Sequence, residues 1–275
     1  MIDVTFRSVS LGRDIPYRVI LPAMSGQNTK FPVVYLLHGG GADFRSWSND
    51  SDVSQYAAHG LILVMPEGGS SYYVNSATHP RDRYEDYIVE DLIPDVDRRF
   101  PTAANRSSRA IAGVSMGGYG AIKLAFDHPD LFVFAGAISA ALDVPSRPFS
   151  VRRVDQWERF RSIFGAVGSS TEQLADPFLF EKASDPARMP YLWLACGRNE
   201  ALLGANRRFV AGLAQRNFLY EFHTAPGGHD WSQWNLQIPS LFQSLEEHLA
   251  ATSLHTGSLA ANSTVPITTT RKGVR

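Results

Sequence analysis

Cysteine is almost missing from this chain, since Cys196 is the only one among 275 residues. One thiol cannot close an internal disulfide or build a zinc site from several cysteines. An excess of one charge is missing too: 26 lysine and arginine residues face 27 acidic residues, which leaves a formal charge of −1. Without a basic surplus, we do not expect the chain to bind a nucleic acid or an anionic membrane surface.

Long apolar segments, repeats and linkers are lacking as well. The sequence contains no run of about 18 apolar residues, the length that is needed to cross a bilayer. Residues 1–11 alternate polar and apolar side chains and lack the pattern of a signal peptide. We therefore predict a single cytoplasmic domain over residues 1–250, and leave open whether it forms a homo-oligomer. Residues 251–275 are rich in serine and threonine without an apolar period, so we expect a disordered tail there.

Short apolar runs alternate with helical patterns along the chain. Runs that are apolar on both faces, as in strands buried on both sides, cover residues 31–37, 61–65, 110–114, 133–138 and 191–195. Helical periodicity covers residues 84–100, 116–126, 201–216 and 232–249. This alternation predicts an α/β fold with a mostly parallel central sheet and helices on both faces, preceded by a hairpin of strands at 4–9 and 15–21. Residues 143–189 break the alternation and predict a small cap insertion over one end of the sheet.

The strongest local signal is Gly113-Val114-Ser115-Met116-Gly117, which follows a predicted strand and opens a predicted helix. In this context the pattern predicts a nucleophile elbow, a sharp turn that exposes a serine hydroxyl. The residues two before and two after the serine come too close to their neighbours for side chains, which explains both glycines. We therefore predict that Ser115 is a catalytic nucleophile.

A serine nucleophile needs a base, and the base that the sequence favours is His229. This residue lies in the glycine-rich segment 226–231, which follows a predicted strand at 218–224 and precedes the last predicted helix. The expected chain order for such an enzyme is serine, acid, histidine. His229 meets that order, since it lies well after Ser115.

The acid that should orient the histidine is best assigned to Glu200, just past the carboxyl end of the predicted strand at 191–195. Asp143, after the preceding strand, is the main alternative, and Asp176 in the insertion is a more distant one. Asp230 adjoins His229 in sequence, which leaves it poorly placed to orient that ring.

An oxyanion hole needs two backbone donors. The amide after the nucleophile belongs to Met116, and the second donor should come from the loop after the strand at 31–37. That loop reads His38-Gly39-Gly40-Gly41. We choose Gly40, because a residue without a Cβ lets the backbone turn its amide inward.

Four aromatic side chains are candidates for substrate contacts. Trp157 and Phe164 fall at helical spacing with Phe160 in the insertion, where packing and lining of an acyl pocket are both open. Trp47 and Trp231, like Tyr72 and Tyr73, lie near predicted strand ends, where they could stack on a substrate or support the loops.

These motifs occur together in a recognisable order. Leu36-Leu37-His38-Gly39-Gly40, the elbow at 113–120, Cys196-Gly197 and Gly228-His229-Asp230-Trp231 resemble the esterase D-like family, and the chain looks closest to small tributyrin-type esterases. The resemblance implies an α/β-hydrolase fold, no cofactor, a triad of Ser115, Glu200 and His229, and oxyanion donors Gly40 and Met116. The family also includes feruloyl and acetyl-xylan esterases, S-formylglutathione hydrolases and mycolyltransferases.

We therefore predict a serine carboxylesterase that hydrolyses small esters with acyl chains of about two to six carbons, each buried methylene adding about 0.8 kcal/mol until the pocket is full. A feruloyl or acetyl-xylan esterase and an S-formylglutathione hydrolase are the enzyme alternatives. A binding protein that has lost catalysis is the remote one, and the complete set of catalytic residues argues against it. No metal site is expected.

Overall fold

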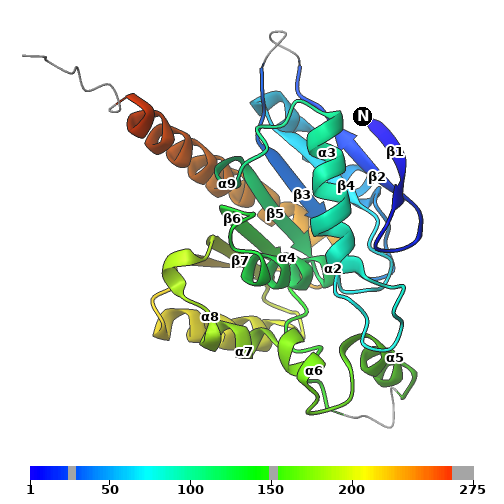
Figure 1. Ribbon diagram of the computed structural model, residues 1–275. Coiled ribbons are helices and arrows are strands. Elements are labelled where there is room, and N and C mark those ends of the chain that lie inside the picture. The colour runs from blue at the N-terminus through cyan, green and yellow to red at the C-terminus, as the bar shows by residue number, and fades with distance from the viewer. Residues whose placement is uncertain (24–28, 149–153, 262–275) are drawn as a thin grey trace, which may run out of the picture.

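The computed structural model describes residues 1–23, 29–148 and 154–261. Within this part of the chain, eight strands form one sheet in the order β1-β2-β4-β3-β5-β6-β7-β8 (Figure 1). The strands are β1 (Ile2–Ser8), β2 (Arg13–Ile20), β3 (Val33–Leu37), β4 (Ile62–Pro66), β5 (Arg109–Val114), β6 (Phe134–Ile138), β7 (Tyr191–Gly197) and β8 (Tyr220–Ala225). β3 to β8 run parallel, whereas the β1–β2 hairpin joins the sheet antiparallel to β4. The predicted α/β-hydrolase architecture is confirmed.

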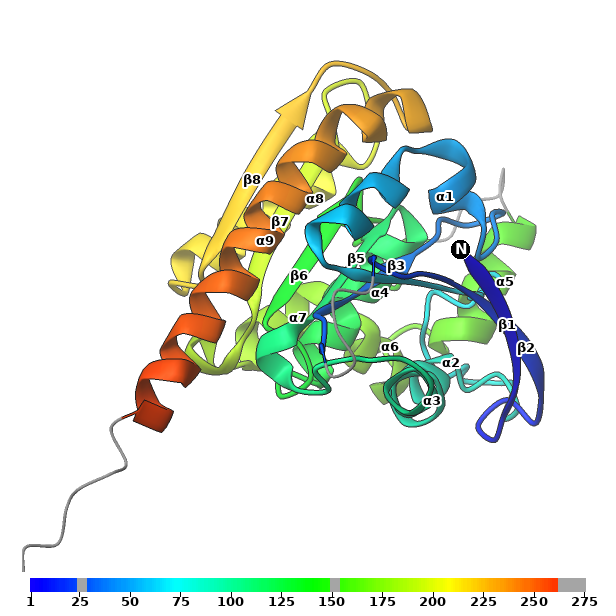
Figure 2. The ribbon, with the colours of Figure 1, turned by 90° about the horizontal axis from the view of Figure 1, so that it is seen from above.

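The central strands are apolar throughout because helices cover both faces of the sheet. In β3, Val33, Tyr35 and Leu37 point into one core, and the alternating residues Val34 and Leu36 point into the other. The first core is closed by α3 (Ile93–Arg99), α4 (Met116–Asp127), α7 (Pro177–Ala183) and α8 (Leu203–Gln215), and the second by α1 (Ser46–Asp50), the 3-10 turn Val53–His59 and α9 (Trp231–Ala261). Figure 2 shows α1 and α3 on opposite sides of the sheet.

The helix expected at 84–100 forms with one irregularity. α2 (Tyr84–Asp86) passes into a wider π-helical segment, Tyr87–Leu92, before α3 begins. Pro94 lies in the first turn of α3 and has no N–H to donate, so the turn before it opens to accommodate the ring. The apolar stripe still faces the core, where Tyr87, Ile88 and Leu92 are fully buried.

The insertion at 143–189 is more ordered than its composition suggests. It holds α5 (Val154–Phe164), α6 (Ser170–Ala175), α7 and the short 3-10 turn Pro186–Arg188. Of the described helices of the insertion, only α5 and α6 lie beyond the end of the sheet as a cap (Figure 1). α7 instead packs on the main core, because Phe180 contacts Phe126 with ring centroids 5.8 Å apart. The cap is therefore smaller than the predicted 143–189.

The C-terminal helix extends further than predicted. α9 continues to Ala261, so a disordered tail over all of 251–275 is wrong for residues 251–261, and the rest of that prediction lies outside the described residues. Alanine and leucine, which are strong helix formers, recur through this stretch and offset its serines and threonines. In the described residues, no helix is both long and apolar enough to cross a membrane.

Parallel strands bring the chemistry-bearing segments to one edge. The carboxyl ends of β3, β5, β6, β7 and β8 lead into His38, Ser115, Ser139, Glu200 and His229. Because neighbouring parallel strands end on the same side of the sheet, residues far apart in sequence meet there.

Candidate active site

Ser115 occupies a strained turn between β5 and α4. Its backbone has φ 55° and ψ −113°, a conformation that L-residues adopt only when their surroundings hold it. A Cβ on Gly113 would lie 2.2 Å from the Gly117 carbonyl carbon, and a Cβ on Gly117 would lie 2.2 Å from the Leu37 carbonyl oxygen. Both glycines are therefore required by close backbone approach, as the elbow pattern predicts.

His229 connects the serine to a carboxylate. Its Nε2 lies 2.8 Å from Ser115 Oγ, and its Nδ1 lies 2.7 Å from Glu200 Oε2. The Glu200 side chain is fully enclosed, whereas the His229 side chain is 40% exposed. A buried carboxylate on Nδ1 holds the proton on that nitrogen, which leaves Nε2 free to accept the proton of Ser115.

The second oxygen of Glu200 is held by groups that the sequence did not reveal. Glu200 Oε1 accepts hydrogen bonds from Ser139 Oγ at 2.5 Å and from the Gly197 amide at 2.8 Å. Ser139 itself has φ 52° and accepts from the indole N–H of Trp234 at 3.2 Å. The only sequence signal for Ser139 is its place directly after β6, next to the strand end that also carries Asp143.

The alternative acids and the thiol occupy other environments. Asp143 pairs with Arg147 at 2.7 Å, and Asp176 caps α7 by accepting from the Phe178 amide. Asp230 caps α9 through the Gln233 amide. Burial, followed by the negative charge of Glu200, raises the pKa of the Cys196 thiol to about 12, so this thiol stays protonated near neutral pH.

The two predicted oxyanion donors lie beside the serine. Gly40 and Met116 line the same cavity as Ser115, and neither amide donates a backbone hydrogen bond to a described residue. The buried His38 holds the loop that carries Gly40 in place. Its Nδ1 lies 2.8 Å from the Gly39 carbonyl oxygen, and its Nε2 accepts a hydrogen bond from the Gly68 amide at 2.9 Å. Two free amides beside a serine hydroxyl can stabilise a negatively charged oxygen.

The cavity around Ser115 has a volume of about 370 Å³. Besides Gly40 and Met116, its lining includes the loop residue Tyr72 and Gln156, Arg159 and Phe160 of α5. Phe160 and Tyr72 were among the aromatic residues that the sequence offered, whereas Gln156 and Arg159 were not selected as substrate contacts. Gln156 and Arg159 are exposed polar residues of α5, and no local pattern indicates that they line a cavity.

The four predicted substrate residues lie elsewhere, and within the described residues none of them lines this cavity. Trp47 is buried, donates to the Leu37 carbonyl at 2.9 Å and meets the half-buried Trp231 edge to face at 5.4 Å. Trp157 is half-buried, with the Arg161 guanidinium 5.9 Å from its ring centre. These tryptophans support the scaffold, because each packs on protein groups.

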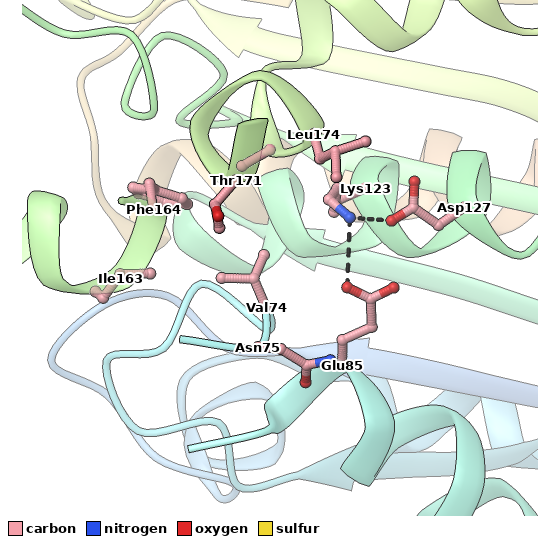
Figure 3. A pocket seen from close by; sticks show the side chains of 10 residues that line it. Val74, Asn75, Glu85, Lys123, Asp127, Ile163, Phe164, Thr171 and Leu174 are labelled. Carbon is pink, nitrogen blue, oxygen red and sulfur yellow. Dashed lines mark hydrogen bonds and ion pairs between the residues drawn. The ribbon is translucent and has the colours of Figure 1, made fainter. Parts of the chain in front are cut away.

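Phe164 faces a separate cavity. Figure 3 shows its ring near Val74 and Thr171, with Lys123 further along the same cavity, ion-paired to Glu85 and Asp127. The ring also packs against Tyr72 and Tyr119, at centroid distances of 5.3 and 5.7 Å. Phe164 therefore lines this second cavity and not the one that contains Ser115.

A serine on a strand–turn–helix elbow, bonded through a histidine to a buried carboxylate on this sheet, defines a serine hydrolase of the α/β-hydrolase class. Among the described residues, no group of three or more His, Cys, Asp or Glu side chains is placed to hold a metal ion.

The chain belongs to the esterase family described as "Putative esterase", which it matches over residues 8–245. It is a carboxylic ester hydrolase. An acetyl esterase of Caldicellulosiruptor saccharolyticus is 24% identical over 88% of this chain and 97% of that protein. The diacylglycerol acyltransferase/mycolyltransferase Ag85B of Mycobacterium avium is 30% identical over 89% of this chain and 82% of its own. The solved structure of the fluorophosphonate-binding serine hydrolase FphF of Staphylococcus aureus is 28% identical, covers 91% of this chain and 97% of its own, and has a TM-score of 0.75.

Proposed function

We propose that this chain is a serine carboxylesterase that hydrolyses small, short-chain acyl esters through an acyl-enzyme intermediate. The observation that carries the proposal is the pair of hydrogen bonds on His229, 2.8 Å to Ser115 Oγ and 2.7 Å to Glu200 Oε2. These distances are those expected of a nucleophile, its base and the acid that orients the base.

The first half-reaction forms the acyl-enzyme. Ser115 Oγ attacks the ester carbonyl carbon while His229 Nε2 takes the hydroxyl proton. The carbonyl oxygen becomes negative and is held by the Gly40 and Met116 amides, each such donor contributing about 2.7–4 kcal/mol to the transition state. The C–O bond to the alcohol then breaks, and His229 returns its proton to the leaving oxygen.

The second half-reaction releases the acid. Water attacks the acyl carbon, His229 Nε2 takes one of its protons, and the same amides hold the oxyanion. The bond to Ser115 Oγ then breaks, and the proton on His229 returns to that oxygen. Glu200 stabilises the imidazolium in both halves and keeps its own negative charge.

The cavity favours short acyl chains. Its volume of about 370 Å³ is near the lower end of the usual range for small-molecule sites. The half-buried Tyr72 and the buried Phe160 line it and leave little room for a long chain. The name of the acetyl esterase relative agrees with a short acyl group.

Replacing the nucleophile tests the proposal. We expect Ser115→Ala to fold, to lose hydrolysis of nitrophenyl acetate by several orders of magnitude, and to lose labelling by a fluorophosphonate probe. Ser54→Ala, which removes an exposed serine hydroxyl outside the site, is the matched control and should retain both. Labelling that persists in Ser115→Ala would contradict the assignment.

A substrate panel tests the preference for short chains. Nitrophenyl esters of increasing chain length, with feruloyl esters and S-formylglutathione beside them, should give the highest kcat/KM between about two and six acyl carbons. A maximum on long-chain lipids, or cleavage of feruloyl sugars alone, would overturn this preference.

A further inference from the structure

A further property of the cavity rests on the proposed function and concerns which esters it prefers. Ser115, Gly40 and Met116 line the cavity together with Gln156 and Arg159 of α5 and with Tyr72. Gln156 and Arg159 are exposed side chains that end in an amide and a guanidinium, and Tyr72 ends in a phenol hydroxyl. The residues that line the cavity with the reacting serine are therefore rich in hydrogen-bond donors.

Arg159 differs from the arginines near it. Arg147 pairs with Asp143 at 2.7 Å, and Arg161 pairs with Glu172 at 2.6 Å. Arg159 has no ion pair and no side-chain hydrogen bond with any residue that the structure describes, although Asp155 and Glu158 lie on the same helix. Its positive charge is therefore available to a ligand in the cavity.

Tyr72 supplies a second available donor. Its backbone is left-handed, with φ 58°, and its ring is held by edge contacts with Tyr119, Phe160 and Phe164 at 5.7, 5.8 and 5.3 Å. Among the described residues, the Tyr72 hydroxyl has no hydrogen-bond partner. Burial raises the pKa of this hydroxyl, while the charges of Arg147 and Arg159 act in the opposite direction, so it remains a protonated donor near Arg159.

We propose that Arg159, assisted by Tyr72, forms an anion subsite in the catalytic cavity, and that the preferred esters carry a carboxylate close to the scissile bond. The planar guanidinium offers paired N–H donors whose spacing matches the two oxygens of a carboxylate. Arg159 is exposed, so water satisfies its donors when a neutral ester is bound, whereas a carboxylate gains a charge-assisted pair of hydrogen bonds. The subsite therefore distinguishes charged from neutral esters of the same size.

The test uses two pairs of esters in which a carboxylate is exchanged for an isosteric amide. On the alcohol side the pair is 3-acetoxybenzoate and 3-acetoxybenzamide, and on the acyl side it is ethyl hydrogen adipate and ethyl 5-carbamoylpentanoate. We expect the unmodified enzyme to prefer the carboxylate in at least one pair by about tenfold or more in kcat/KM. The pair that shows the preference identifies which side of the ester reaches Arg159.

Variants assign the preference to its residue. Arg159→Gln should bring the carboxylate-to-amide ratio close to one, Arg159→Lys should keep part of it, and Tyr72→Phe should lower it less than Arg159→Gln does. Arg207→Gln removes an exposed arginine of α8 outside the cavity and should leave the ratio unchanged. Intrinsic differences in ester reactivity cancel, because each variant is compared with the unmodified enzyme on the same pair.

The outcomes separate this inference from the proposed function. If the amide esters are cleaved and neither pair shows a preference for the carboxylate, the anion subsite is wrong and the esterase proposal stands. A preference that survives Arg159→Gln also overturns the assignment. If neither these esters nor nitrophenyl acetate is cleaved, the proposed function fails, and the subsite fails with it.

Discussion

The Glu200 carboxylate is the most completely satisfied group of the site, since its side chain is fully enclosed and both oxygens have partners. A buried carboxylate without such partners would cost several kcal/mol. Ser139 and the Gly197 amide hold one oxygen and leave the other aimed at His229 Nδ1. The acid is thus positioned by β6 and β7 together.

Glu200→Gln should lower kcat by about a thousandfold or more with little change in KM. The amide can present an N–H to His229 Nδ1, which then favours the wrong imidazole tautomer. Steady-state kinetics with nitrophenyl acetate measures the effect. Asp143→Asn is the control and should retain most of the activity, because Asp143 binds Arg147. The opposite result would place the acid after β6.

At the scale of elements, different residues of α5 line two separate cavities. Phe160 lines the cavity around Ser115, and Phe164, one turn later, is fully buried beside the cavity that holds Lys123. The Phe160 and Phe164 rings still contact each other, at 6.4 Å. The same helix therefore contributes to the cavity that contains Ser115 and to the core of the cap.

Phe164→Ala should destabilise the protein and leave its substrate range unchanged. Removing a fully buried phenylalanine costs about 3–5 kcal/mol of the free energy of unfolding, which a urea titration measures. The chain-length optimum should stay where it is, because Phe164 does not line the Ser115 cavity.

Phe160→Ala is the matched variant, since it enlarges the reactive cavity and should move the optimum to longer acyl chains. A shift of the optimum in Phe164→Ala and none in Phe160→Ala would reverse these assignments.

At the scale of the whole molecule, α9 closes one face of the sheet. Trp234, Ile238, Leu241, Phe242 and Leu245 are all buried in that core, and Leu249 is the last of the buried residues described on this helix. The helix also begins at the loop that carries His229. Its first turns, as far as Leu249, therefore support both the core and the site.

A chain that ends at residue 250 should fold and retain esterase activity, because it keeps every described core contact of α9 and all of the site. A chain that ends at residue 237 should not fold, since it exposes the apolar face that Leu241, Phe242 and Leu245 cover. Circular dichroism melting and nitrophenyl acetate hydrolysis measure both. Loss of folding in the longer chain would show that residues beyond 250 belong to the domain.

The sequence alone determined the sheet, the nucleophile elbow and the three hydrogen-bonded residues Ser115, His229 and Glu200. Strands that are buried on both faces appear in the sequence as continuous apolar runs. The close backbone approach around Ser115 admits only glycine at positions 113 and 117, so the elbow also has a recognisable local pattern. Glu200 and His229 could be chosen because parallel strands end at one edge and the expected chain order is known. Cytoplasmic location and oligomeric state stay predictions.

Only the tertiary structure decided which side chains surround Ser115, His229 and Glu200. Aromatic periodicity in α5 indicates which side chains are buried but not what they are buried against, so the sequence could not separate Phe160, which lines the cavity, from Phe164, which does not. Ser139 meets Glu200 across 61 positions, and Arg159 of α5 lines the cavity that also contains Ser115. Such contacts depend on how separate elements pack, and no local pattern encodes them.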